Sequence, residues 1–470
     1  MNKPTEDTLT ATSDTIQDRL AEYACTLGYE ALSADAIHAA KVRIIDTLGA
    51  LFGGFFEEPC RIARSIAARV PDAQGATIIG TRMKTTPDMA AFVNATMSRC
   101  VEMNDTYHGP GSHGGHPSDV VLPVFAVAEH AAASGRDLIV GVVLAYEAYL
   151  RVSDQLPTPT GFDCTTFSTL GIATAGAKLL RLTPAETAHA IAMAVVPNNA
   201  LNQARSGHLT MWKAVAAGQA GRAGVFAALL AREGMAGPHL PFEGKAGWCD
   251  YVARRRFKLD VMGGNGNPFK VQETLLKKRA CCATSVSTIL AAEKVAQLIA
   301  EVQEVERITV ETYKWSQVIC GSAEHHWHPM SRETADHSIP YGVAAAILDG
   351  TVSPSSFDDA HISNPQLRAL MAKVEVVVSD EFTAAYEQHP VVHRSRVTVL
   401  MRDGKRLVGE AGGDENDLST PMSDQQVADK FTRSAEPLLG TKRTSALLER
   451  VWRLESCQDV AAIPALCVFA

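Results

Sequence analysis

The sequence has no Cys-x-x-Cys pair and no His-Glu-x-x-His motif, although it contains 10 cysteines and 15 histidines. The first absence argues against a cysteine-ligated cluster, and the second against the helical zinc site of many metalloproteases. An excess of basic residues is missing too, because the net charge is −8. Bulk electrostatics therefore gives no support for nucleic-acid binding.

Long apolar runs are also absent. The longest, such as residues 138–149, are too short to span a bilayer or contain a charged residue such as Glu147. Residues 1–15 are polar and lack the basic start and the apolar run of a signal peptide. Because the cysteines are scattered as well, we expect a cytoplasmic protein with reduced thiols.

The chain does contain enough apolar material for a large core. Its 470 residues are 46% hydrophobic and 20% charged, an ordinary balance for a globular protein of two or three domains. Helical patterning dominates from about residue 16 to 265. Ser33 is the predicted N-cap of a helix to about Phe52, and Thr183-Pro-Ala-Glu186 predicts a capping box. Another helix is expected over 210–233, where Ala and Gly would let neighbouring helices approach closely.

The pattern changes at residues 263–268, which are rich in Gly and Asn and end in Pro268. Alternating apolar and polar residues then predict strands at 308–312, 374–378 and 396–402. Asp403-Gly404 predicts a hairpin after the last of them.

Residues 422–455 return to helical patterning, with Ser423 as the expected N-cap. We therefore expect a mainly α protein, in which a large all-helical domain is interrupted by a smaller α+β lid domain. The predicted boundaries are 1–267 and 413–470 for the helical domain and 268–412 for the lid.

The densest set of reactive side chains lies in the segment from Glu102 to Asp119. Glycines and prolines rule out a regular helix through its middle, so a loop between two helical segments is expected. The groups that can move protons or bind metal are Glu102, Asp105, Thr106, His108, His113, His116 and Asp119. Loops held by rigid elements often carry chemistry, although a polar connector is the plain alternative.

Several stretches together resemble the MmgE/PrpD family, which comprises 2-methylcitrate dehydratases, cis-aconitate decarboxylases and iminodisuccinate epimerases. The matching stretches are Lys41–Gly49, Ala90–Asn94, Asn104-Asp-Thr106, Gly115-His-Pro-Ser-Asp119, Met211-Trp-Lys-Ala214, Glu333–Tyr341 and Asp429-Lys-Phe431. They follow the family's order over most of the chain. The Asn-Asp-Thr, Gly-His-Pro-Ser-Asp and Ala-Asp-His-Ser-x-Pro-Tyr forms favour the methylcitrate dehydratase branch.

The resemblance implies a helical domain formed by both chain ends, an inserted α+β lid and a homodimer. It also implies chemistry without metal or organic cofactor, in the cleft between the domains. Residue by residue, the family's site falls on Glu102, Asp105, Thr106, His116, Lys213, Tyr341 with His337 beside it, and Lys277 or Lys278.

Three departures from the family pattern bear on the substrate. Asp163-Cys164 stands where Asp-His is usual, and Glu102 stands where Asp is usual. The family's Lys-x-Tyr-Pro is here Lys277-Lys-Arg-Ala280, followed by Cys281-Cys282.

The substrates implied by the resemblance are di- or tricarboxylates that react at a carbon beside a carboxylate. Such a reaction needs cations, a base for the carbon and an acid for a leaving hydroxyl. We expect the catalytic residues to be Asp105, His116, Lys213 and Tyr341. We expect the substrate-binding residues to be Glu102, Thr106, Arg205, Lys277 and His337.

The expected reaction is metal-independent loss of water from a 2-methylcitrate-like hydroxy-tricarboxylate. Decarboxylation of cis-aconitate and epimerisation of an iminodisuccinate-type acid remain alternatives. A Lys in a first helical turn and a His in a Gly-rich loop are unusual core residues. Replacing Lys213 or His116 is therefore expected to spare the fold.

Two further classes of function remain open. Three imidazoles could hold zinc or iron, in a metal-dependent hydrolase. The candidate ligands are His108, His113 and His116, or His325, His326 and His328. Alternatively, the altered motifs at Cys164 and Lys277 indicate a relative that binds carboxylates without turning them over.

Overall fold

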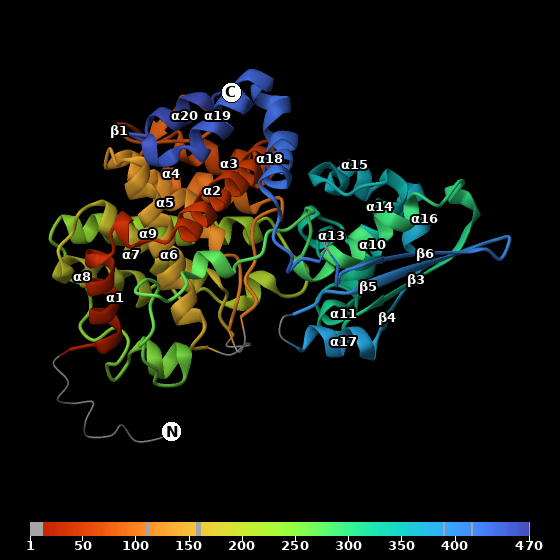
Figure 1. The fold of residues 1–470 in the computed structure, drawn as a ribbon, viewed down its shortest axis with the longest axis horizontal. Coiled ribbons are helices and arrows are strands. Elements are labelled where there is room, and N and C mark those ends of the chain that lie inside the picture. Colours follow the sequence, from red (N-terminus) through yellow and green to blue (C-terminus); the bar gives the residue numbers. More distant parts are fainter. Residues whose placement is uncertain (1–12, 110–111, 157–160, 389–390, 415–416, 470) are drawn as a thin grey trace.

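The computed structural model describes residues 13–109, 112–156, 161–388, 391–414 and 417–469. The polar tail predicted at 1–15 therefore falls mostly outside the described residues, as do Pro110 and Gly111 of the Gly-rich loop. Figure 1 shows a large body of helices beside a smaller body that contains a sheet. The mainly α fold class predicted from the sequence is confirmed.

The larger body begins with helices that follow one another along the chain. They are α1 (Thr15–Thr26), α2 (Ala34–Gly54), α3 (Glu58–Ala67), α4 (Pro87–Arg99), α5 (Val121–His130), α6 (Gly135–Ser153), α7 (Thr165–Leu179), α8 (Pro184–Val195) and α9 (Trp212–Arg232). Predicted caps are present: the Ser33 hydroxyl accepts from the backbone of Ala36, and Thr183 and Glu186 form the capping box of α8.

Small residues let α9 pack closely against its neighbours. A Cβ added at Gly218 would lie 2.5 Å from the carbonyl oxygen of Phe92 in α4, and one at Gly224 would lie 2.8 Å from Ile172 in α7. Neither position can hold a larger residue without moving a helix. Among the described residues, α9 is the only helix long and apolar enough to cross a membrane, and 61% of its apolar window is buried inside the protein.

The C-terminal helices return to the first part of the chain. They are α18 (Asp424–Leu439), α19 (Thr441–Trp452) and α20 (Ala462–Leu466). Figure 1 shows them in blue against α2, α3 and α4 in orange. Lys430 of α18 secures this return, because its Nζ lies 2.6 Å from Oδ1 of Asp46 in α2 and donates to the carbonyl of Met103 at 2.7 Å.

The larger body is not purely helical. Strands β1 (Pro71–Thr77) and β2 (Lys84–Thr85) form a short antiparallel pair between α3 and α4. Glu129 of α5 holds its edge by accepting from the backbone N–H of Thr77 at 2.8 Å.

The smaller body combines short helices with a four-stranded sheet. Its helices are α10 (Val286–Ala296), α11 (Lys314–Cys320), α12 (Glu324–Trp327), α13 (Arg332–Ala335), α14 (Ile339–Asp349), α15 (Asp359–Ile362), α16 (Pro365–Met371) and α17 (Asp380–Tyr386). Its strands are β3 (Val305–Thr312), β4 (Val374–Val378), β5 (Ser395–Met401) and β6 (Arg406–Ala411), in the order β4-β3-β5-β6.

The predicted hairpin joins β5 and β6, and Gly404 has the positive φ (85°) that its turn requires. Strand β3 pairs with β4 in parallel and with β5 antiparallel. Helices α10 and α14 cover the sheet with a separate hydrophobic core, which also takes in Ala50, Val101 and Met103 from the larger body.

The two bodies meet at the loop before α9. The backbone N–H of Leu209 donates to Oγ1 of Thr334 at 3.3 Å, and the Ser331 hydroxyl donates to the carbonyl of Leu209 at 3.1 Å. This contact brings the start of α9 against α13, just before the motif that contains His337.

Candidate active site

Glu102 lies at the centre of a buried charged cluster, three residues beyond the end of α4. Its backbone has a φ of 52°, which is uncommon for a residue other than glycine. One carboxylate oxygen accepts from Arg99 and lies 3.3 Å from Nζ of Lys213. The other lies 2.6 Å from Nζ of Lys277, which also donates to the Glu102 carbonyl at 3.0 Å. Functional sites often hold such strained backbone.

Lys213 joins this cluster to the smaller body. It lies in the first turn of α9, where a cation is unfavourable without a neighbouring anion. The structure supplies Asp336, whose two oxygens lie 2.7 and 2.9 Å from Nζ. Lys213 is completely buried, so the premise that it lies outside the core is wrong, and its replacement is now expected to lower stability.

His337 completes this side of the cluster. Its Nδ1 lies 2.5 Å from Oδ1 of Asp336 and 3.4 Å from Nζ of Lys213. It precedes α14, because Ser338 caps that helix by accepting from the backbone of Tyr341. Burial and Lys213 oppose a charge on His337, but Cys282 and Asp336 outweigh them and raise its pKa to about 9.

His116 lies near Glu102 and is half-buried. Its Nδ1 lies 2.8 Å from the carbonyl oxygen of Asp105, so Nδ1 is the protonated nitrogen and Nε2 carries the lone pair. Burial, Arg99 and Lys277 hold the pKa of His116 well below its usual range. The ring is therefore neutral and able to accept a proton.

Asp105 is held too firmly to approach a substrate directly. Oδ1 accepts from the backbone N–H of Ser118 at 2.8 Å, and Oδ2 accepts from the Tyr146 hydroxyl at 2.9 Å. Its carbonyl fixes the tautomer of His116. Its position therefore supports a role in orienting His116 rather than in taking the proton itself.

The cluster carries more positive than negative charge. Arg99, Lys213 and Lys277 face Glu102 and Asp336, which leaves one net positive charge before His337 and the bordering Asp119 are counted. Burial alone would raise the pKa of Glu102, but the three cations hold it well below its usual range. A buried cation excess favours an anionic ligand.

Asp119 borders the cluster without neutralising it fully. Oδ1 accepts from Asn104 at 3.2 Å and lies 3.6 Å from Nε of Arg99. Burial raises the pKa of Asp119 to about 7, although Arg99 and Arg205 oppose the shift.

Arg205 is the third predicted cation of the site. Its Nε donates to Oδ2 of Asp163 at 2.8 Å and its Nη1 donates to the carbonyl of Lys213 at 3.0 Å. Its Nη2 is buried and has no hydrogen-bond partner among the described residues. A buried guanidinium N–H without a partner is costly and is available to a carboxylate.

Cys164, where the family usually has histidine, faces the Gly-rich loop. A Cβ added at Gly115 would lie 2.4 Å from the Cβ of Cys164 and 2.4 Å from the Tyr149 hydroxyl. Burial raises the pKa of the Cys164 thiol to about 12, so this group is a neutral packing residue.

Thr106 and two of the histidines lie beside the cluster rather than within it. The Thr106 hydroxyl lies 3.1 Å from Nε2 of His108, and its backbone pairs with Leu275. His113 binds the carbonyl of Phe162 at 2.8 Å. His108, His113 and His116 therefore turn toward different partners, and among the described residues no three His, Cys, Asp or Glu side chains are grouped to hold a metal.

Tyr341 and Lys278 lie away from the cluster. The Tyr341 hydroxyl donates to the carbonyl of Ser356 at 2.7 Å, and its ring stacks on Phe357 in the core of the smaller body. Lys278 reaches the carbonyl of Asp417 at 3.4 Å. The structure thus selects Lys277 from the two adjacent lysines.

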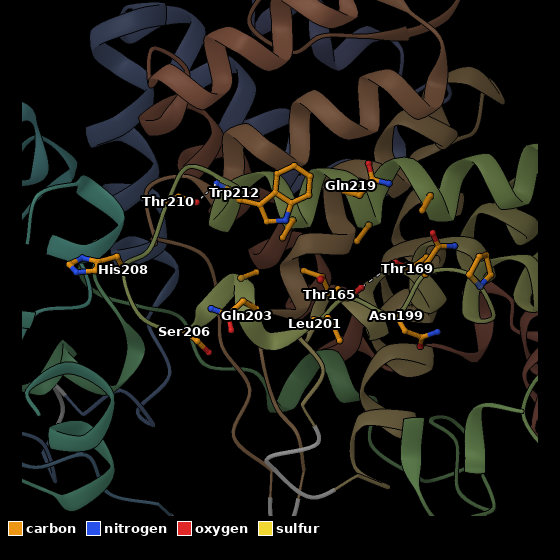
Figure 2. A pocket seen from close by; sticks show the side chains of 17 residues that line it. Thr165, Thr169, Asn199, Leu201, Gln203, Ser206, His208, Thr210, Trp212 and Gln219 are labelled. Carbon is orange, nitrogen blue, oxygen red and sulfur yellow. Dashed lines mark hydrogen bonds between the residues drawn. The ribbon is translucent and has the colours of Figure 1, made fainter. Parts of the chain in front are cut away.

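Two cavities lie near these residues. The one in Figure 2 has a volume of about 670 Å³ and is lined by α9, α7 and the loop before α9, with Trp212, Leu201 and His208 among its side chains. The other, of about 730 Å³, lies between the Gly-rich loop and α11 and α17, and His108, Lys314 and Tyr386 line it. The second cavity lies between the two bodies, and no member of the charged cluster lines either cavity.

Two domain families of known proteins match most of the chain. The MmgE/PrpD N-terminal domain matches residues 18–260, and the MmgE/PrpD C-terminal domain matches residues 280–454. The chain belongs to the MmgE/PrpD family. It is an MmgE/PrpD-type lyase.

Three relatives illustrate the range of this family. Cis-aconitate decarboxylase of Homo sapiens is 26% identical over 456 residues, which cover 93% of this chain and 91% of that protein. The mitochondrial 2-methylcitrate dehydratase of Yarrowia lipolytica is 25% identical, with 90% and 82% covered. The 2-methylcitrate dehydratase of Salmonella typhi is 26% identical, with 81% and 82% covered.

Three residues of this MmgE/PrpD site were not singled out from the sequence. Arg99 precedes Glu102 by three residues, a spacing that could have indicated a pair. Asp336 lies inside a matching motif beside His337. Cys282 is adjacent in sequence to Cys281, and nothing in that dipeptide indicates which of the two raises the pKa of His337.

Proposed function

We propose that this enzyme removes water from a hydroxy-tricarboxylate resembling 2-methylcitrate. The observation that carries the proposal is the buried cation excess around Glu102, together with the unpartnered Nη2 of Arg205. The negative charge of a substrate with two or three carboxylates would compensate the excess positive charge of this cluster.

In this proposal His116 removes the proton from the carbon beside a carboxylate. Its Nδ1–H is committed to the Asp105 carbonyl, so Nε2 is the acceptor. Lys213 and Arg205 stabilise the negative charge that develops on the carboxylate as the proton leaves. Glu102 holds Lys213 and Lys277 in place, and the proposal assigns Thr106 and Lys277 to substrate binding.

A second candidate is decarboxylation of cis-aconitate. The specific support is coverage: the cis-aconitate decarboxylase of Homo sapiens and a cis-aconitate decarboxylase-like protein of Aspergillus oryzae match 93% of this chain, whereas the bacterial 2-methylcitrate dehydratases match about 81%. Both reactions require stabilised negative charge beside a carboxylate, so one cluster can serve either.

The test is to incubate the purified protein with 2-methylcitrate, cis-aconitate and an iminodisuccinate-type acid. An increase in the absorbance of the conjugated acid from 2-methylcitrate, without carbon dioxide, supports dehydration. Release of carbon dioxide from cis-aconitate would instead identify the enzyme as a decarboxylase. A change in optical rotation alone would identify it as an epimerase. If the protein binds these acids specifically but converts none of them, it is a non-catalytic carboxylate-binding protein.

A further inference from the structure

Lys430 is a buried lysine that the proposed mechanism does not use. Its side chain is 5% exposed, and its Nζ lies 2.6 Å from Oδ1 of Asp46, whose side chain is 1% exposed. Helices α2 and α18, which carry the pair, pack closely, because a Cβ added at Gly49 would lie 3.4 Å from the Cα of Phe431. The pair has no net charge, so it does not add to the cation excess of the charged cluster.

A second hydrogen bond directs Lys430 toward the active site. The same Nζ donates to the carbonyl of Met103 at 2.7 Å. The preceding carbonyl, that of Glu102, accepts from Nζ of Lys277 at 3.0 Å. Two consecutive carbonyls are therefore each held by a buried lysine, and these bonds fix the two peptide planes that follow Glu102.

These bonds lie where the backbone needs support. Glu102 has a φ of 52°, a conformation that residues other than glycine keep only where the surrounding structure enforces it. In this conformation its carboxylate lies 2.6 Å from Nζ of Lys277 and 3.3 Å from Nζ of Lys213. Relaxation of the backbone at Glu102 would redirect the carboxylate and change both distances.

We propose that Lys430 is a positioning residue of the active site, which holds the left-handed backbone of Glu102 through the carbonyl of Met103. Asp46 keeps the ammonium group in place for this bond. Without the bond, Glu102 would no longer fix its two lysine partners where a carboxylate substrate meets them. The inference rests on the part of the proposed function that assigns a carboxylate substrate to the charged cluster.

Lys41 provides a matched control in the same part of the fold. It is 8% exposed, against 4% for Lys430, and it also joins α2 to the C-terminal helices. Its Nζ donates to the carbonyl of Trp452 at 2.9 Å and pairs with Glu455. Neither partner belongs to the charged cluster or to the segment that carries Glu102. Replacing Lys41 therefore tests stability alone.

The first experiment measures kcat and the melting temperature of the wild type, Lys430→Met and Lys41→Met with a 2-methylcitrate-like acid. Methionine is of similar length but donates no hydrogen bond. Both variants should melt at a lower temperature, because each loses buried hydrogen bonds. Only Lys430→Met should lower kcat, by about 100-fold, the effect of a displacement of about 1 Å in an active site. An equal fall in both variants, or no fall in Lys430→Met, overturns the proposal.

The second experiment tests whether Lys430 acts through Glu102. Calorimetry measures the binding of propane-1,2,3-tricarboxylate, which has no hydroxyl to lose, to the wild type, Lys430→Met, Glu102→Gln and the double variant. Lys430→Met alone should weaken binding about tenfold, the contribution of one hydrogen bond to a charged group. In the Glu102→Gln background the same change should alter Kd by no more than about twofold. Equal effects in both backgrounds would show a general structural role and overturn the proposal.

If Lys430→Met does not fold, Asp46→Asn replaces it in both experiments. The amide fills the space of the carboxylate but binds the ammonium group less strongly, so Lys430 is held less firmly against the carbonyl of Met103. The value of kcat should fall, and the effect on binding should again depend on Glu102. A wild-type kcat in Asp46→Asn overturns the proposal.

These two readouts separate the possible failures. A wild type that binds the tricarboxylate, with the Glu102-dependent effect of Lys430, but dehydrates no acid removes the proposed dehydration and keeps the positioning role. A wild type that dehydrates its substrate, while Lys430→Met keeps the same kcat and Kd, leaves the dehydration and removes the positioning role. A wild type that neither binds nor converts a tricarboxylate removes both.

Discussion

Lys213 is completely enclosed and binds two carboxylates, so its removal should affect stability and chemistry together. Lys213→Ala leaves Glu102 and Asp336 with less compensation, which should lower the free energy of unfolding by about 3–5 kcal/mol. It should also lower kcat/KM. Urea unfolding and steady-state kinetics measure the two effects, with Lys442→Ala on the exposed face of α19 as the control. Unchanged stability in Lys213→Ala would contradict the buried ion pairs.

Asp119 should make stability depend on pH in the direction opposite to most carboxylates. Its pKa is raised to about 7 in the folded chain, so the folded state binds a proton that the unfolded state has already released. The stabilisation is complete below the unfolded value of about 3.9 and is lost as pH rises toward about 7, with a slope near 1.4 kcal/mol per pH unit.

Asp119→Asn should remove this slope, because an amide does not titrate. Unfolding free energies at about pH 5.5 and about pH 7.5 measure it, and the variant should lose less stability across that window than the wild type. Parallel curves for the two proteins would mean that Asp119 is ionised throughout.

At the scale of single elements, the capping box of α8 gives a local test. The hydroxyl of Thr183 accepts from the backbone of Glu186, whose carboxylate in turn accepts from the backbone and the hydroxyl of Thr183. Thr183→Ala should cost about 0.5–2 kcal/mol of stability. Because the box is exposed and belongs to none of the elements that form the charged cluster, kcat should not change. Thermal unfolding and kinetics of this variant decide both points, and a loss of kcat would show that α8 influences the site.

Elements with local signals were predictable, and those defined by distant partners were not. The Ser423 cap, the Thr183 box and the Asp403-Gly404 turn depend on neighbours within a few residues. Strand β2 has only two residues and exists because it pairs with β1. Two residues are too few to show the alternation of apolar and polar side chains that predicts a strand.

The site shows the same division. The motif resemblance identified Glu102, Lys213 and His337, which the fold brings together from three distant segments. The choice of Lys277 over Lys278, and the placement of Tyr341 in the core of the smaller body, depend on tertiary packing. Sequence alone cannot state which of two adjacent lysines points inward.

At the scale of the whole molecule, the homodimer implied by the family resemblance stays a prediction, and an apolar face offers a place for it. Leu201 (64% exposed), Trp212 (55%) and Phe226 (51%) are large apolar side chains on α9 and the segment before it. Figure 2 shows Leu201 and Trp212 at the cavity on this face. Exposed apolar patches of this kind commonly mark interaction sites.

Light scattering should therefore give a mass of two chains for the wild type. Trp212→Glu places a charge on the proposed contact, and burying an unpaired charge costs several kcal/mol, so this variant should shift toward one chain. Met330→Glu is the control, because Met330 is 78% exposed and lies on the smaller body. A wild type with the mass of one chain would remove the dimer. A dimeric Trp212→Glu variant would instead place the contact on another face, and leave the apolar side chains around Trp212 without a partner in the assembly.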